Sequence, residues 1–134
     1  MKKKYLLEQC KRLKLIHTDE TIQYINDNNE WWVNHNKGHE ILIDDFINYI
    51  DKTNQLDKNE VKKWLRKKMA YSNKIIKSLD IKYNLFINDE EMNEEDNYTY
   101  SLQDGIICIS LTILEIVNKK KYISKRKTSA GNWT

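Results

Sequence analysis

Two of the three histidines stand at a spacing that suits metal binding. His35 and His39 are four residues apart, and side chains four apart share one face of a helix. Gly38 lies between them, however, and glycine often ends a helix. A tetrahedral site would also need another soft ligand to come near, from His17, Cys10 or Cys108. We therefore interpret both histidines as surface residues near a helix end, and we assign no metal site and no cofactor.

Patterns that would carry catalysis are weak in this chain. Glu60-x-Lys62 and Asp80-x-Lys82 have the acid-x-Lys spacing of metal-dependent nucleases, but such short patterns arise by chance in a chain with 23 lysines and arginines. The 3 glycines are too few to build a phosphate-binding loop, and no nucleophile elbow is present. We expect no enzymatic activity.

The tryptophans are the candidate anchors for a partner. Trp31 and Trp32 are adjacent, and neighbours on a helix point about 100° apart, so we expect one to pack and the other to be partly exposed. An exposed tryptophan is a typical interface anchor, and a small core that needs bulk is the alternative explanation. Trp133 lies in the terminal segment, where it is an incidental exposed residue or a third anchor.

Acidic side chains crowd into residues 89–96, where only Met92 is apolar. We expect an exposed, mobile loop here, and we assign it as a partner-binding segment. Its acidic members are Asp89, Glu90, Glu91, Glu94, Glu95 and Asp96.

A basic helix is expected over residues 57–79. Asp57 is a good N-cap, and Val61, Leu65 and Ile76 recur at helical spacing. The opposite face is strongly basic, so it could contact phosphates or be neutralised by acids elsewhere in the chain. The residues assigned to a nucleic-acid contact, as the alternative working surface, are Lys62, Lys63, Arg66, Lys67 and Lys74.

The first 52 residues predict several short helices. Residues 3–16 form an amphipathic helix, and Thr18 caps a second one with Ile22 and Ile25 on its inner face. A break follows at residues 26–29, because Asn and Asp side chains compete with helical hydrogen bonds. A short helical turn from Glu30 to His35 then ends near Gly38, and a further helix follows over residues 39–52.

The second half is ambiguous between helix and strand. Residues 81–87 show a weak strand pattern, and residues 101–121 carry both a helical stripe and an Asp104-Gly105 hairpin signal. Length favours the helix for residues 101–121. The prediction is a mainly α, compact single domain of about five helices, or an α+β domain with a small hairpin or sheet from residues 81–113.

The 134 residues fit one domain, which we place at residues 1–127, with a flexible tail at 128–134. Proline is absent, which favours helices. No secretion signal is evident and the run from Ile106 to Val117 is too short to span a bilayer, so we expect a cytoplasmic protein off the membrane. In that setting Cys10 and Cys108 would be buried, reduced thiols.

Charge segregation is the main clue to function, because the net charge is only +3. We expect a small non-enzymatic inhibitor or regulator that binds a protein target, itself a nucleic-acid-handling one, through the acidic loop and the exposed aromatics. Small helical proteins of this type occur in phage and mobile elements, such as anti-CRISPR and immunity proteins, which is an analogy of type alone. The alternative is a nucleic-acid-binding regulator that uses the basic helix. The oligomeric state is open.

Overall fold

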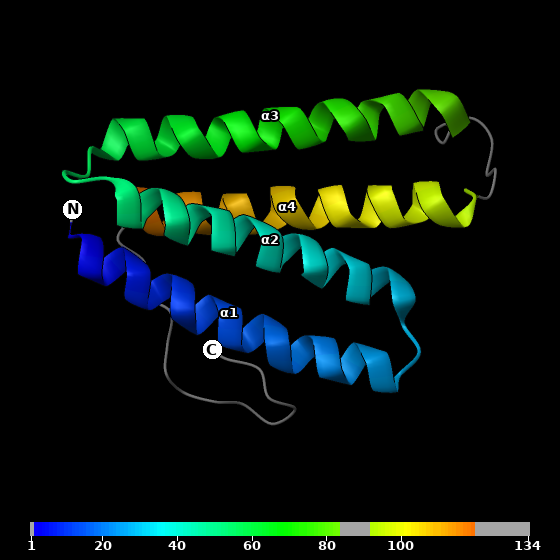
Figure 1. Ribbon diagram of the computed structural model, residues 1–134. Helices are drawn as coiled ribbons and strands as arrows, with labels where there is room; N and C mark the ends of the chain where they lie inside the picture. Colours follow the sequence, from blue (N-terminus) through cyan, green and yellow to red (C-terminus); the bar gives the residue numbers. More distant parts are fainter. Residues whose placement is uncertain (1, 84–91, 120–134) are drawn as a thin grey trace.

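The computed structural model describes residues 2–83 and 92–119, which fold into four helices. These are α1 (Lys3–Asn26), α2 (Glu30–Lys52), α3 (Lys58–Tyr83) and α4 (Glu94–Lys119). The helices run alternately up and down, so α2 and α4 are parallel and form the central pair, with α1 packed on α2 and α3 packed on α4 (Figure 1). The expected mainly α class is confirmed, while the expected count of about five helices is wrong.

Helix α1 continues through the point where two helices were expected. The Thr18 hydroxyl donates to the Lys14 carbonyl at 2.9 Å, so this side chain bonds back into the preceding turn and caps nothing. In the second half of α1, Ile22 and Ile25 are exposed, whereas the sequence predicted them on an inner face. The break after α1 is confirmed: Asn28 adopts a positive φ of 56°, which Asn tolerates, and Asn29 caps α2 by accepting from the Trp32 amide.

Helix α2 runs unbroken through Gly38, because this glycine is needed for packing and not for a helix end. A Cβ atom at Gly38 would lie 2.1 Å from the Leu102 carbonyl oxygen of α4. Reciprocally, a Cβ atom at Gly105 would lie 1.9 Å from the His35 carbonyl oxygen of α2. The two backbones therefore touch where α2 and α4 cross, which no larger residue would permit.

The hairpin alternative is wrong for the part of the second half that the structure describes. Residues 81–83 extend α3, and residues 101–119 belong to α4, with Gly105 inside the helix. Residues 84–87 of the expected strand lie outside the described ranges. At the start of α3 the Asp57 carboxylate accepts from the Asn59 amide at 2.8 Å, as expected of an N-cap.

The interior of the bundle changes character along its length. One half, toward the start of α1 and the end of α2, holds a continuous apolar cluster around Phe46, Ile50 and Ile113. We call it the apolar half; its buried members are Leu6, Cys10, Leu13, Leu42, Ile43, Phe46, Ile50, Val61, Leu65, Ile109, Ile113, Ile116 and Val117. The other half, which we call the polar half, buries His35, Asn36, His39, Ser72 and Ser101.

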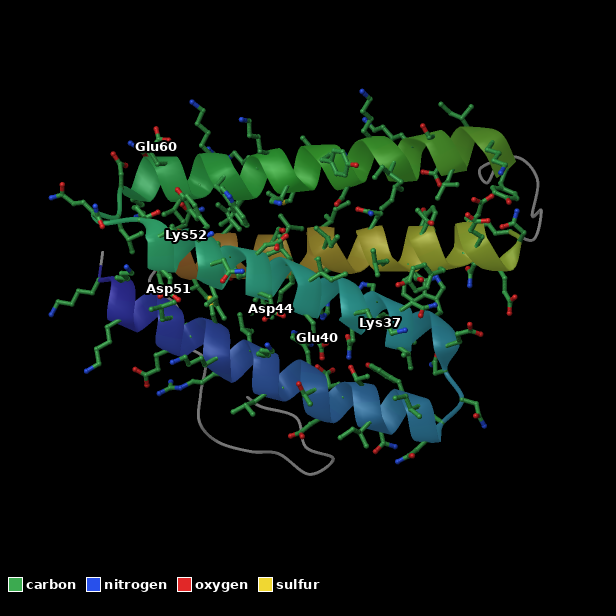
Figure 2. The ribbon with its side chains drawn as sticks, viewed as in Figure 1. Lys37, Glu40, Asp44, Asp51, Lys52 and Glu60 are labelled. Carbon is green, nitrogen blue, oxygen red and sulfur yellow. The ribbon has the colours of Figure 1, made fainter. Side chains whose placement is uncertain are left out.

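The outer face of α2 is polar and partly acidic. Figure 2 shows Lys37, Glu40, Asp44 and Asp51 spaced along it, and Asp44 pairs with Lys14 of α1 at 2.7 Å. On the other flank of α2, Asp45 lies 3.5 Å from Lys68 of α3. Exposed pairs of this kind contribute at most about 1 kcal/mol each, so the buried contacts and not these pairs hold the helices together.

Helix α4 is long and apolar enough to cross a membrane by length and composition alone. Its most apolar stretch is 39% buried within the bundle, and core helices of soluble proteins have the same composition. This is weak evidence for a membrane span.

Candidate functional site

The described part of the acidic segment is the first turn of α4. Glu94 and Glu95 are exposed there, while Asp96 accepts hydrogen bonds from Lys82, at 2.7 Å, and from the Tyr83 hydroxyl. These two hydrogen bonds lower the pKa of Asp96. The expectation of a loop is therefore wrong for residues 94–96, because carboxylates at a helix N-terminus are favourable and the Asn93 side chain caps the turn. Asp89, Glu90 and Glu91 lie outside the described residues.

The tryptophan pair divides as expected. Trp32 is 41% exposed, whereas Trp31 is half-buried, and the two rings meet edge to face at 4.9 Å. Trp32 also stacks on Tyr24 of α1 at 5.9 Å. Trp133 lies outside the described residues, so its assignment stays a prediction.

Acidic and aromatic side chains share one end of the bundle. The α1–α2 turn and the starts of α2 and α4 all lie at this end (Figure 1). We call it the acidic end; its exposed members are Asp27, Glu30, Trp32, Glu94, Glu95 and Tyr98. The fold therefore gathers acidic and aromatic residues from two separate segments of sequence.

The basic residues of α3 lie on the face turned away from the bundle. Lys63, Arg66, Lys67 and Lys74 are exposed, and Lys62 is half-buried. Within residues 2–83 and 92–119, no ion pair involves any of these five side chains. From Lys63 to Lys74 the face is about 16 Å long at the usual helical rise. These five side chains therefore form a candidate phosphate-binding surface.

The histidines form a cluster in the polar half, contrary to the expectation of surface residues. His35 is 4% exposed and His39 is 7% exposed, and their rings meet edge to face at 4.6 Å. They are buried because α2 does not end at Gly38 and so carries both side chains into the interface with α1 and α4. Trp31 stacks on His35 at 5.2 Å and covers it.

The third histidine joins the cluster from α1. His17 Nδ1 lies 3.0 Å from His39 Nδ1 and 3.0 Å from the Glu20 carboxylate. Asn36 donates to the His17 carbonyl at 3.4 Å, which ties α2 to α1 beside the rings. The pair of Nδ1 atoms requires that at least one ring carry its proton there.

Burial favours the neutral form of His35 and of His39. It lowers the pKa of His39 to about 2, and the neighbouring His17 and His35 add to the effect. Burial also lowers the pKa of His35, although the adjacent Asp104 acts in the opposite direction. Two ring nitrogens in this cluster, His35 Nδ1 and His39 Nε2, are buried without a hydrogen-bond partner.

On the α4 side, His35 meets a carboxylate and a thiol. His35 Nε2 lies 3.1 Å from Asp104 Oδ2, and Cys108 Sγ lies 4.0 Å from the same oxygen. Cys10 is buried as expected, and burial raises its pKa to about 12. The expectation that Cys108 is buried is wrong, since it is exposed at the flank of α4; partial burial and Asp104 raise its pKa.

The cluster was not predicted from the sequence, because α1 was expected to end at residue 16 and α2 was expected to be interrupted at Gly38. The buried stripe of α1, Leu6, Cys10 and Leu13, continues at helical spacing to His17, which a helix ending at residue 16 removes from the core. The available signal was a polar residue at a core position.

No protein-family model, no curated protein and no solved structure matches this chain.

Proposed function

We propose that this protein is a small non-enzymatic inhibitor or regulator that binds a protein target through its acidic end. The observation that supports this most is the convergence of exposed acids and aromatics at one end of the bundle. Glu94 and Glu95 project from the first turn of α4, and Trp32 lies exposed at the start of α2. Charged rims around aromatic anchors are typical of specific protein interfaces.

The charge of this end selects the kind of target. Among the residues described at this end, Lys82 pairs with Asp96 and Lys37 lies over the Tyr98 ring, while Asp27, Glu30, Glu94 and Glu95 are all exposed, so acids outnumber these two cations. Such a surface attracts a cationic groove, the kind with which nucleic-acid-handling proteins bind phosphates. We therefore propose that the target is a cytoplasmic protein with a basic surface.

The test is a pull-down from nuclease-treated lysate of the source cells, with the full chain as bait. The variant Glu90→Gln/Glu91→Gln/Glu94→Gln/Glu95→Gln should lose the protein partner that the native chain retains. Once the partner is identified and purified, its affinity for the variant should fall at least about 10-fold, since several rim charges act together in steering and docking.

A matched control neutralises acids elsewhere on the same scaffold. Asp51→Asn/Glu60→Gln changes exposed carboxylates at the opposite end of the bundle and should leave binding unchanged. Equal loss in both variants, or a partner that survives neutralisation of the acidic end, would remove this end as the working surface.

A second candidate function is binding of nucleic acid by α3. It is favoured by the five cationic side chains of its outer face, which have no ionic partner among the described residues. In this case Lys63, Arg66 and Lys67 displace counterions from phosphates.

The salt dependence of binding distinguishes this candidate function, nucleic-acid binding, from the first, binding of a protein target. Binding of a fluorescent DNA or RNA duplex should weaken steeply with salt, and each lysine changed to glutamate should reduce the slope by about 1. Lys63→Glu/Lys67→Glu would abolish such binding while leaving the acidic end intact. A salt-insensitive interaction would exclude the phosphate contact.

A further inference from the structure

Three side chains that could bind a metal ion lie between α2 and α4, beside the point where these helices cross. His35 Nε2, Asp104 Oδ2 and Cys108 Sγ all lie within 4.8 Å of one another. The nitrogen and oxygen are 3.1 Å apart, and the sulfur and oxygen are 4.0 Å apart. Bond lengths of about 2.0 to 2.3 Å in a tetrahedral zinc site place neighbouring ligand atoms roughly 3.3 to 3.6 Å apart. The three atoms therefore need only small side-chain rotations to meet one ion.

The ligand types select a class of metal. A histidine nitrogen, a carboxylate oxygen and a thiolate are the donors of zinc sites, and sulfur disfavours the hard cations Mg²⁺ and Ca²⁺. Asp104 and Cys108 are four residues apart on one helix, so they project from the same flank of α4. The third ligand comes from another helix, which fixes the site to the folded state.

The scaffold holds the three ligands without help from an ion. Gly38 and Gly105 bring the two backbones into contact, so the position of His35 over α4 is set by backbone packing. Trp31 and Trp32 pack against the His35 ring, at 5.2 and 4.9 Å. The ligands are thus placed on rigid elements, as a binding site requires.

The site is buried on one side and open on the other. His35 is 4% exposed, the Asp104 side chain is 36% exposed, and Cys108 is exposed. An ion can enter from the Cys108 side and keep its fourth position for water or another ligand. Three protein ligands with an open position are the arrangement of zinc sites that bind or activate a further molecule.

The second ring nitrogen of His35 can take the ring proton when Nε2 binds a metal. In the metal-free ring, Nε2–H donates to Asp104 and Nδ1 is buried without a partner. When Nε2 gives its lone pair to a metal, the ring proton moves to Nδ1, where no existing hydrogen bond is disturbed. The Cys108 thiol releases its proton to water as the metal–sulfur bond forms.

We propose that His35, Asp104 and Cys108 bind one divalent transition-metal ion of the zinc class. The three ligands are not among the residues of the acidic end, although Trp32 of that end packs against His35, and the metal site does not depend on the proposed function. His39 packs against the ligand His35, and His17 packs against His39 on the side of α1.

The test is titration of the purified, chelator-treated full chain with Co²⁺ alone and then with Zn²⁺ in competition. We expect one ion per chain, a thiolate-to-cobalt charge-transfer band, and quenching of the fluorescence of Trp31 and Trp32 by cobalt. Zn²⁺ should remove the band. Cys108→Ser should abolish the band and weaken binding at least about 10-fold, and Asp104→Asn should weaken binding similarly.

Cys10→Ser is the matched control, because Cys10 is the other cysteine of the chain and is not part of this group. It should keep both the band and the stoichiometry. Cys108 is exposed, so its variant should fold, which circular dichroism checks. The proposal is overturned if no saturable 1:1 binding occurs, or if the charge-transfer band survives Cys108→Ser.

Discussion

The two halves of the bundle are held together in different ways. In the apolar half, large side chains such as Phe46 and Ile113 fill most of the space between the helices, and few polar side chains, such as Gln9 and Ser110, are buried there. In the polar half, the backbones of α2 and α4 touch at Gly38 and Gly105, and the interior combines histidines, amides and hydroxyls with apolar side chains such as Ile76 and Leu79.

The two halves contribute differently to stability. Burying an apolar side chain contributes roughly 1.5 to 3 kcal/mol, whereas a buried polar atom without a partner costs about 1 to 3 kcal/mol. The polar half contains two such atoms, on His35 and His39. The apolar half therefore carries most of the stability, and the polar half keeps residues that a purely structural core would replace.

The largest effect is expected where the two helices touch. Gly105→Ala places a methyl group 1.9 Å from the His35 carbonyl oxygen, which is backbone and cannot rotate away. The helices must separate, and the free energy of unfolding should fall by about 3 kcal/mol, measured by urea denaturation.

Ser78→Ala provides the control, because Ser78 is exposed on α3 and its substitution should change stability by less than about 0.5 kcal/mol. If Gly105→Ala is as harmless as Ser78→Ala, the backbone contact does not hold the polar half together.

A smaller effect is expected from pH. The pKa of His39 is lowered to about 2 by burial, whereas an unfolded histidine titrates near 6.5. The unfolded chain therefore binds a proton below about pH 6.5 that the folded chain does not, so stability is full above this pH and falls as the pH decreases. Between pH 7.5 and pH 5 the loss from His39 should be about 2 kcal/mol, measured with a chelator present.

His35 adds a loss of the same sign, because its pKa is also lowered, while Asp104 and Glu20 face the cluster as partly compensating charges. Most carboxylates titrate below this window, which isolates the histidines. Equal stability at pH 7.5 and pH 5 would show that the polar half opens readily to water.

The sequence predicts the apolar half well and the polar half poorly, for one physical reason. Helical spacing of apolar residues identifies buried faces, so Leu42, Phe46 and Leu65 were placed correctly. Glycine, by contrast, can either end a helix or allow two helices to pack closely. At Gly38 and Gly105 it permits close packing, a role that depends on the partner helix and is invisible in a local pattern.

The candidate site shows the same limit. The spacing of His35 and His39 was compatible with metal binding, but the prediction was two surface histidines and no metal site. The contacts of these two rings come from residues 69 and 22 positions away, at Asp104 and His17. Only the crossing of α2 over α4 and α1 brings these side chains together. The exposed surfaces were easier to predict from the sequence, because a charge pattern such as the basic face of α3 depends on one helix alone.

The most discriminating prediction exchanges single residues between the two halves, and its first change has the smallest expected effect. His39→Leu removes a buried nitrogen without a partner and leaves His17 its contact with Glu20, so stability at pH 7 should rise by about 1 kcal/mol. One turn further along α2, the reverse change Leu42→His inserts an unsatisfied polar ring into the apolar half and should cost about 3 kcal/mol. Urea denaturation of both variants measures the contrast directly. A stability gain at His39 means that the native histidine is kept at the expense of folding, as a functional cluster requires; a loss larger than about 1 kcal/mol would instead assign the histidines to the structure of the bundle.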